Sequence, residues 1–311
     1  MTIPLAVISG FLGAGKTTLI LAAARILRAR GLRPAVILND QAGDLVDTRL
    51  VQASGLDCGQ VTGGCFCCRL PDLIDSAERL LAVKPDIIFA EAVGSCTDIV
   101  ATTLRPLLRD HGADFRTLPL TVAAHPQAVF DDPDLAFLHR NQLAEADIIY
   151  ERGHSVEAWL DRLMDPATPV GDRHLEIDYR RYAEAEAALA WMNLRVTARS
   201  RTPISAPMLI GPLLDRLEPQ VRIVHLKIFA ESEAGYLKAA LTANGQEPAV
   251  EGALDASPAA EHEIVLNVRA LNDPAELRAT VEREFAALPA RLTWHQFDCF
   301  RPSPPVPYLR L

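Results

Sequence analysis

Residues 3–18 read IPLAVISGFLGAGKTT, and this stretch decides the fold. An apolar segment of strand length comes first, then the spacing G-x-x-x-x-G-K-T at residues 10–17, and then a helix-like run that extends to about residue 30. A strand, a glycine-rich turn and a helix in that order are the context in which this motif forms a phosphate-binding P-loop. The sequence therefore predicts a site for a nucleoside triphosphate.

The residue types of the motif match the chemistry of a triphosphate. Glycines let backbone N–H groups curl around the β-phosphate at the positive end of the following helix. Lys16 is placed to reach the β- and γ-phosphates, and the Thr17 hydroxyl to bind Mg²⁺. The expected nucleotide site comprises Gly10, Gly13, Ala14, Gly15, Lys16, Thr17 and Thr18.

Composition narrows the class of protein. The chain has 311 residues, 49% of them apolar, and a net charge of −9, which disfavours a dedicated nucleic-acid binder. No apolar run reaches about 18 residues, so we expect no membrane span. The first strand begins at the N-terminus, so we expect no signal peptide. Three of the six cysteines lie within four positions, which favours a reducing, cytoplasmic setting over a disulfide framework.

Acidic residues follow the second predicted strand, residues 34–39. Ligands of open α/β sheets lie beyond the carboxyl ends of the strands, so this loop is expected to reach the nucleotide. Asp40, Asp44 and Asp47 are candidates for a water-mediated contact with Mg²⁺. A solvated acidic loop is the alternative interpretation of each residue.

Cys65, Cys67 and Cys68 follow a pair of glycines that permits a tight turn. Thiolates are soft ligands, so the triplet predicts a site for Zn²⁺ or Cu(I), with cobalt and nickel also open. One loop offers three sulfurs, and a tetrahedral ion needs a fourth ligand from elsewhere, from a partner or from water. His125 is one candidate, although a histidine at a strand end is more often structural. A redox-active cysteine and simple packing are the alternatives.

A second acidic element follows in residues 85–91, an apolar strand that ends at Glu91. After a P-loop, such a carboxylate organises Mg²⁺ and the attacking water, so we expect Lys16 and Glu91 to be the catalytic residues. Gly94 is placed for its backbone N–H to approach the γ-phosphate. Cys96, on a helix expected over residues 95–108, is interpreted as a small core residue.

The order of elements predicts an α/β fold. We expect a P-loop NTPase domain with a mostly parallel sheet over residues 1–218 and a smaller C-terminal α/β domain over residues 219–311. A helix is expected over residues 182–199 at the end of the first domain. The second domain is expected to alternate strands at 221–230, 264–270 and 292–299 with helices at 235–243 and 274–288.

Taken together, three landmarks resemble the CobW-type GTPases, a family that includes metal chaperones and activators of nitrile hydratase. The landmarks are GFLGAGKTT at residues 10–18, GGCFCC at residues 63–68 and EAVG at residues 91–94. The resemblance implies slow GTP hydrolysis with Mg²⁺ and a metal ion, Zn²⁺ or Co²⁺, on the cysteine triplet. It also implies delivery of that ion to a client metalloprotein or a cobalamin-related protein. A homodimer is left open.

Some positions depart from the family pattern. Asp40 stands where the family usually has glutamate, and Val93 where it has serine or threonine. The guanine-reading N-K-x-D motif is replaced by residues 150–154, YERGH, so ATP is left open beside GTP. Two other functions therefore stay open: an adaptor that senses nucleotide or metal without hydrolysis, and an ATP-using P-loop protein with redox-active cysteines.

Overall fold

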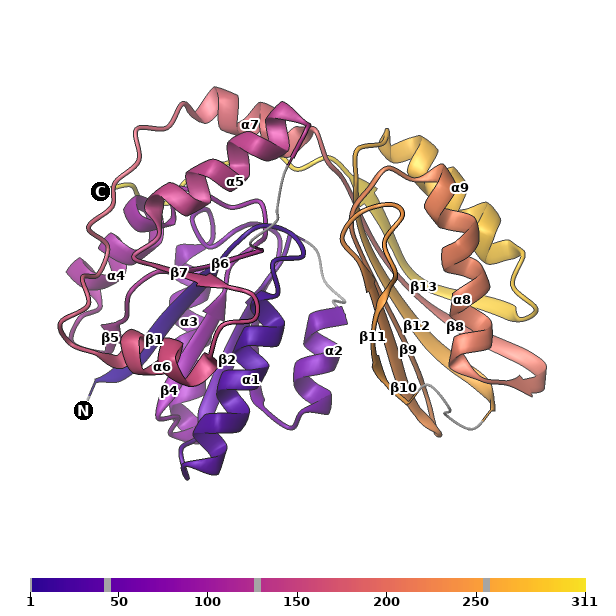
Figure 1. The fold of residues 1–311 in the computed structure, drawn as a ribbon, viewed down its shortest axis with the longest axis horizontal. Coiled ribbons are helices and arrows are strands. Elements are labelled where there is room, and N and C mark those ends of the chain that lie inside the picture. The colour runs from indigo at the N-terminus through magenta and orange to yellow at the C-terminus, as the bar shows by residue number, and fades with distance from the viewer. Residues whose placement is uncertain (1, 42–45, 126–129, 254–257) are drawn as a thin grey trace. The chain divides into compact units, whose positions relative to one another are not determined.

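The computed structural model describes residues 2–41, 46–125, 130–253 and 258–311 (Figure 1). The chain divides into two compact units. The first unit comprises Met1–Gln41, Leu50–Glu186 and Ser303–Leu311, and the second comprises Ala42–Arg49 and Ala187–Pro302.

The first unit is built on a parallel sheet with the order β3-β2-β4-β1-β6-β7, and β5 also pairs with β1. The central strands β1, β2 and β4 are nearly or wholly buried, which is why they read as continuous apolar runs in the sequence. The expected parallel sheet is confirmed. The strands are β1 (Ile3–Ser9), β2 (Pro34–Asn39), β3 (Asp57–Val61), β4 (Ile87–Glu91), β5 (Phe115–Thr117), β6 (Thr121–Ala124) and β7 (Ile148–Glu151).

Helices connect these strands. α5 begins directly after Asp132, whose carboxylate accepts hydrogen bonds from two backbone N–H groups of the first turn, with Pro133 as the first helical residue. α1 packs against α6, and α3 packs on β2 and β3. The helices are α1 (Lys16–Ala29), α2 (Val46–Ala53), α3 (Leu70–Leu80), α4 (Arg105–Asp110), α5 (Pro133–Glu145), α6 (Val156–Met164) and α7 (Tyr179–Ala187), with short helical turns at Leu81–Val83 and Val100–Leu104.

The second unit is an antiparallel sheet with the order β11-β10-β9-β12-β8-β13. Helices α8 and α9 cover one face, and the core lies between them and the sheet (Figure 1). The elements are β8 (Ala190–Ile204), α8 (Ala206–Leu217), a short turn at Glu218–Gln220, β9 (Ile223–Ser232), β10 (Gly235–Leu241), β11 (Ala249–Gly252), β12 (Ala259–Ala270), α9 (Pro274–Ala286) and β13 (Arg291–Phe300).

Three of the expected helices are wrong over part or all of their length. Residues 235–241 form strand β10, which pairs with β9 through a tight hairpin in which Gly235 lies opposite Ser232. This pairing outweighs the helix propensity of the Leu-Lys-Ala-Ala-Leu segment. The helix expected over residues 182–199 ends at Ala187, and β8 follows with alternating side chains. The helix expected from residue 95 begins only at residue 100.

The compact units also place β8 and α8 with the second sheet. The expected boundary near residue 218 separates two parts of the chain that would each fold independently, and it stays a prediction.

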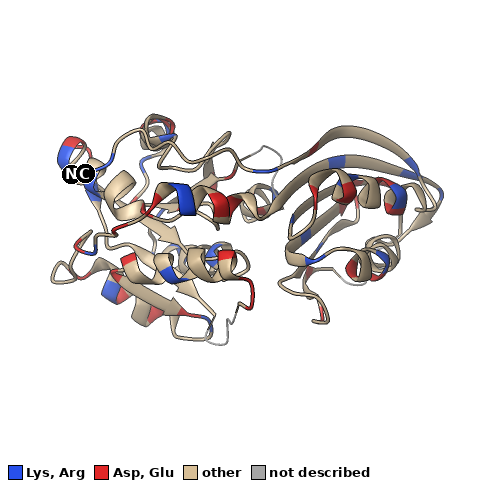
Figure 2. Cartoon of the chain, turned by 90° about the horizontal axis from the view of Figure 1, so that it is seen from above, with Lys and Arg blue, Asp and Glu red and all other residues tan. Residues whose placement is uncertain are grey.

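Charged residues of both signs are interspersed along the described parts of both units (Figure 2). None of the helices described by the structure is long and apolar enough to cross a bilayer.

The first turn of α2 packs on the face of the second sheet that α8 and α9 leave uncovered. Val46 contacts Phe229 and Val265, and its backbone N–H donates to Asn267 Oδ1 over 2.8 Å. Phe229 and Val265 alternate along their strands with residues of the helix-covered core, so they point to the opposite face. Residues 46–49 are therefore anchored to the second unit.

A partly buried ion pair strengthens this attachment. Lys227 Nζ donates to both oxygens of the Asp47 carboxylate, over 2.7 and 2.6 Å. Burial alone would raise the pKa of Asp47, but the Lys227 ammonium outweighs it and holds that pKa well below the usual range. A depressed carboxyl pKa stabilises the fold above the unfolded value near 4 and loses that stabilisation as the pH falls.

We predict that Lys227→Ala lowers the free energy of unfolding by about 2 kcal/mol at neutral pH, because it leaves the partly buried Asp47 carboxylate without its cation. Urea denaturation followed by circular dichroism measures this change. The control is Arg199→Ala, which removes an exposed ion pair with Glu261 in the same unit and should change the unfolding midpoint little. Equal changes in unfolding free energy for the two substitutions would contradict the stabilising role of the Asp47–Lys227 pair.

Candidate nucleotide and metal site

The predicted P-loop lies between β1 and α1, as the sequence indicated. Gly15 precedes α1 with φ of 90°, a left-handed conformation that favours glycine. Lys16 is buried, and its Nζ donates to the carbonyl oxygens of Gly10 and Phe11 over 2.9 and 3.4 Å. The ammonium group thus already lies over the loop whose backbone would hold the phosphates.

Glu91 and Thr17 meet beside this loop. β4 pairs in parallel with β1, and the register places Glu91 opposite Ile8. Glu91 therefore lies at the carboxyl end of the sheet, where Thr17 Oγ1 donates to Glu91 Oε1 over 3.1 Å. Both side chains are buried. A hydroxyl and a carboxylate side by side are hard oxygen donors, so this pair fits the requirements of Mg²⁺.

Two glycines let the loop pack closely between its neighbours. A Cβ on Gly10, which has φ of +135°, would lie 2.3 Å from the carbonyl oxygen of Ala123 at the end of β6. A Cβ on Gly94 would lie 2.6 Å from the side chain of Leu12 in the P-loop. The segment that follows Glu91 is thus in direct contact with the phosphate-binding loop.

The other nucleotide-site residues predicted from the sequence differ in their surroundings. Ala14 is buried and Thr18 is exposed, while Asp40 follows β2 at a half-buried position. Asp44 lies outside the described residues. Asp47, a third candidate for contact with Mg²⁺, pairs instead with Lys227 in the second unit.

The three cysteines converge on one point. Their sulfur atoms all lie within 4.8 Å of one another, with Sγ–Sγ distances of 3.5 Å for Cys65–Cys68 and 3.6 Å for Cys67–Cys68. The loop that carries these cysteines begins after β3. Asn39 Nδ2 holds it by donating to the Gly64 carbonyl over 2.7 Å. Cys65 and Cys67 are buried and Cys68 is partly exposed. The cluster therefore has one accessible sulfur.

The raised pKa values of the triplet argue against a redox-active cysteine. Contact with Cys65, together with burial, raises the pKa of the Cys68 thiol to about 11. Contacts with Cys65 and Cys68 raise the pKa of Cys67 even further. Reactive cysteines instead combine solvent access with a lowered thiol pKa. A soft cation is the natural partner of three such thiols, and its binding would displace their protons.

A fourth sulfur, which the sequence analysis assigned to the core, lies beside the triplet. Cys96 Sγ is 4.0 Å from Cys67 Sγ, and Cys96 is fully buried. Contacts with Cys65 and Cys67 lower the pKa of Cys96 to about 6. His125, the earlier candidate for a fourth ligand, is exposed and is not part of the described ligand cluster.

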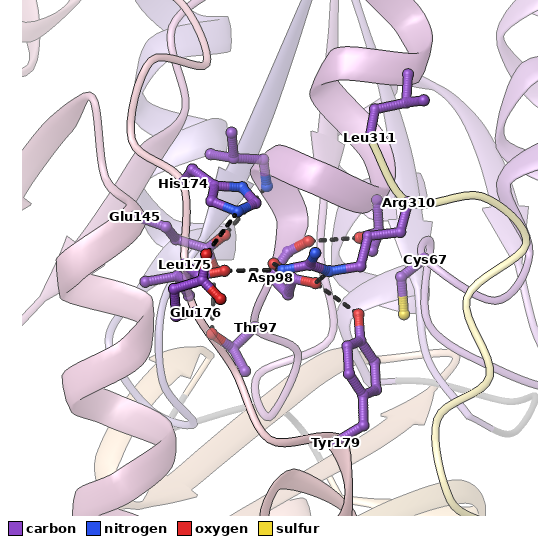
Figure 3. Close-up of polar contacts among 12 residues, drawn as sticks. Cys67, Thr97, Asp98, Glu145, His174, Leu175, Glu176, Tyr179, Arg310 and Leu311 are labelled. Atoms are coloured by element: carbon purple, nitrogen blue, oxygen red, sulfur yellow. Dashed lines mark hydrogen bonds and ion pairs between the residues drawn. The ribbon is translucent and has the colours of Figure 1, made fainter.

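The segment Ser303–Leu311 also belongs to this site. The backbone N–H of Tyr308 donates to the Cys67 carbonyl over 2.8 Å, and that of Leu311 donates to the Ala101 carbonyl over 2.9 Å. Arg310 Nε donates to the buried carboxylate of Asp98 over 2.8 Å (Figure 3). No local pattern could have indicated this pairing, because 212 residues separate the two partners.

Asp98 anchors a second side chain near the cysteines. Tyr179 donates its hydroxyl proton to Asp98 Oδ2 over 2.5 Å (Figure 3). Asp98 itself has φ of 65°, a left-handed conformation that is uncommon for a residue with a side chain. The backbone two residues after Cys96 is therefore held in a strained conformation by a buried polar network.

A buried carboxyl group lies under the same segment. Glu145 is fully buried, accepts from Thr97 Oγ1 over 3.3 Å and accepts from the backbone N–H of Val100 over 3.1 Å (Figure 3). Burial, with a smaller contribution from the charge of Asp98, raises the pKa of Glu145 to about 8. The group is therefore mainly protonated at neutral pH.

Residues 150–154, which replace the expected guanine-reading motif, begin at the end of β7. Tyr150 and Glu151 close this strand, and the Tyr150 hydroxyl donates to the His154 carbonyl over 2.9 Å. Glu151 is partly exposed and lies 3.6 Å from His154 Nε2. Glu151 thus occupies the region of the missing motif with an acceptor group available.

Fold and site together define a P-loop nucleotide-binding protein. Residues 4–149 match the model of the CobW/HypB/UreG nucleotide-binding domain. The chain is also 39% identical over 102 residues, 30% of its length, to a protein described as the zinc chaperone CobW from Sinorhizobium sp. The match spans 28% of that relative.

Solved structures show weaker likenesses. The Zn(II)-bound YjiA GTPase from E. coli is 14% identical, with 93% of this chain and 99% of that chain covered and a TM-score of 0.33. HypB from Helicobacter pylori in complex with nickel is 16% identical, with 47% and 62% covered and a TM-score of 0.35.

We predict that Glu145 makes stability fall with rising pH. Because its pKa is raised in the fold, the native state holds a proton that the unfolded chain loses. Its stabilisation is complete below pH 4.5 and decreases as the pH rises toward 8. Relative to Glu145→Gln, the wild type should lose about 3 kcal/mol of unfolding free energy between pH 5 and pH 8.

Urea denaturation at several pH values tests this slope. Glu184→Gln, at an exposed position on α7, is the matched control and should follow the wild type. Parallel pH profiles of the wild type and Glu145→Gln would show that Glu145 is ionised in the fold at neutral pH.

Proposed function

We propose that this chain is a nucleotide-dependent metal carrier that hydrolyses GTP slowly and transfers a zinc or cobalt ion to a client protein. One observation carries the proposal. The cysteine loop, Asp40, Glu91 and the P-loop lie at or directly after the carboxyl ends of neighbouring strands, in the order β3-β2-β4-β1. In open α/β sheets this edge is where ligands bind, so nucleotide and metal would share one edge.

The P-loop side of the site is equipped for phosphoryl transfer. Lys16 would hold the β- and γ-phosphates, and Thr17 with Glu91 would hold Mg²⁺, which neutralises charge on the phosphate oxygens when it is bound. Glu91 would also orient the attacking water. The contacts among these side chains already hold them in place, which supports their assignment.

The sulfur side is suited to an ion that is held and released. Zinc and cobalt both accept tetrahedral thiolate ligands. Cys65 and Cys67 are buried, whereas the partly exposed Cys68 gives an incoming or departing ion a route through ligand exchange. The exposed sulfur favours a carrier, because structural zinc sites are closed.

The match to the CobW/HypB/UreG domain favours GTP as the nucleotide. Residues 4–149 match that domain, and Glu151 at the end of β7 offers an acceptor for the donor groups of guanine. Adenine lacks that donor pattern, so a preference for GTP would identify Glu151 or a neighbour as the substitute for the missing aspartate. The relative described as a zinc chaperone supports zinc as the ion. The proposed recipient is a client metalloprotein or a cobalamin-related protein.

A comparison of two variants tests the proposal. In the triple variant Cys65→Ser, Cys67→Ser, Cys68→Ser, stoichiometric zinc binding should be lost while nucleotide affinity is kept. In Lys16→Ala, phosphate release should fall at least about a hundredfold while zinc binding is kept. Chelator competition measures zinc affinity, and calorimetry and phosphate release are measured with GTP and with ATP.

Cys299→Ser, on β13 of the second unit, is the matched control and should behave as the wild type in every assay. Unchanged zinc affinity in the triple variant would end the carrier proposal. An absence of phosphate release with either nucleotide, with and without zinc, would instead identify an adaptor without turnover.

A further inference from the structure

Cys96 is placed beside the metal site by the segment that follows Glu91. Val93, Gly94, Ser95 and Cys96 form a tight turn in which the Cys96 N–H donates to the Val93 carbonyl over 3.0 Å. This turn directs the Cys96 sulfur toward the cysteine loop, to a distance of 4.0 Å from Cys67 Sγ. Two segments separated by 29 residues thus bring their sulfurs together.

The distances suit a shared metal ion. A tetrahedral ion with metal–sulfur bonds of about 2.3 Å places its sulfurs about 3.8 Å apart. The separations of 3.5 Å for Cys65–Cys68, 3.6 Å for Cys67–Cys68 and 4.0 Å for Cys67–Cys96 lie on either side of that value. Cys96 lies outside the set of sulfurs that are all within 4.8 Å of one another, so an ion shared by the four sulfurs would draw Cys96 closer to the triplet. Cys67 is the common member, with the partly exposed Cys68 on one side and the fully buried Cys96 on the other.

The surroundings of Cys96 are not those of a cysteine that only fills an apolar core. Its neighbours in the chain, Ser95 and Thr97, are fully buried polar residues, and their hydroxyls donate to buried carboxyl groups. Gln142 Nε2 donates to the carbonyls of Gly94 and Cys96 over 2.9 and 3.0 Å. A polar network therefore fixes this turn and holds the sulfur beside the cluster.

We propose that Cys96 is the fourth sulfur ligand of the transferred ion, so that Cys65, Cys67, Cys68 and Cys96 form an all-thiolate site. This inference rests on the proposed carrier function and adds to it the inner ligand. Cys96 lies five positions after Glu91 and two after Gly94, which packs on Leu12 of the P-loop. A nucleotide that moves this segment would also move the fourth sulfur, changing the coordination from four sulfurs to three.

Cobalt titration of the full chain counts the sulfurs. The intensity of thiolate-to-cobalt charge-transfer absorption scales with the number of thiolates. Cys96→Ala should therefore lose about a quarter of the wild-type intensity and at least about tenfold in zinc affinity. Cys58→Ala, which removes a partly exposed thiol of β3, is the matched control and should keep the wild-type spectrum and affinity.

X-ray absorption of the zinc-loaded wild type gives a second readout that needs no variant. Four sulfur scatterers are expected, and three sulfurs with one nitrogen or oxygen would overturn the assignment. A folded Cys96→Ala protein with an unchanged cobalt spectrum and zinc affinity would overturn it as well. Failure of the carrier proposal looks different, because zinc binding would then survive loss of Cys65, Cys67 and Cys68 together.

Discussion

The hydrogen bond between Thr17 and Glu91 is the contact on which the rest of the site depends. It joins the first turn of α1 to the last residue of β4, and it exists because β1 and β4 pair in parallel with Glu91 opposite Ile8. A shift of one residue in that register would turn the Glu91 side chain to the other face of the sheet. The buried apolar strands therefore fix the geometry of the Thr17–Glu91 pair.

The segment after Glu91 contacts both the P-loop and the cysteine cluster. Gly94 packs on the P-loop, Cys96 reaches Cys67, and Asp98 binds Arg310 of the segment that also contacts the cysteine loop. Residues 94–98 thus connect the predicted phosphate-binding loop with the cysteine cluster. In the proposed carrier, a change in the nucleotide would act on the metal through this turn, because the turn contacts both sites.

Local sequence patterns were sufficient to predict the structure where residues close together in the chain determine it. The P-loop, the buried parallel strands and the convergence of the cysteine triplet follow from spacing and from one short turn. Prediction failed where distant pairing decides: residues 235–241 form a strand because β9 lies beside them. The approach of Cys96 to Cys67 and the pairing of Asp98 with Arg310 also arise only when distant segments meet. A single sequence holds no signal for such contacts.

Zinc affinity in two nucleotide states tests most directly whether the two sites are coupled. The full chain with Mg²⁺ is titrated with zinc against a chromogenic chelator, once with GDP and once with a non-hydrolysable GTP analogue, at constant ionic strength. The account predicts that the two zinc dissociation constants differ at least about tenfold, which corresponds to a coupling free energy of about 1.4 kcal/mol. Equal zinc affinities in the two states, with both nucleotides bound, would contradict it.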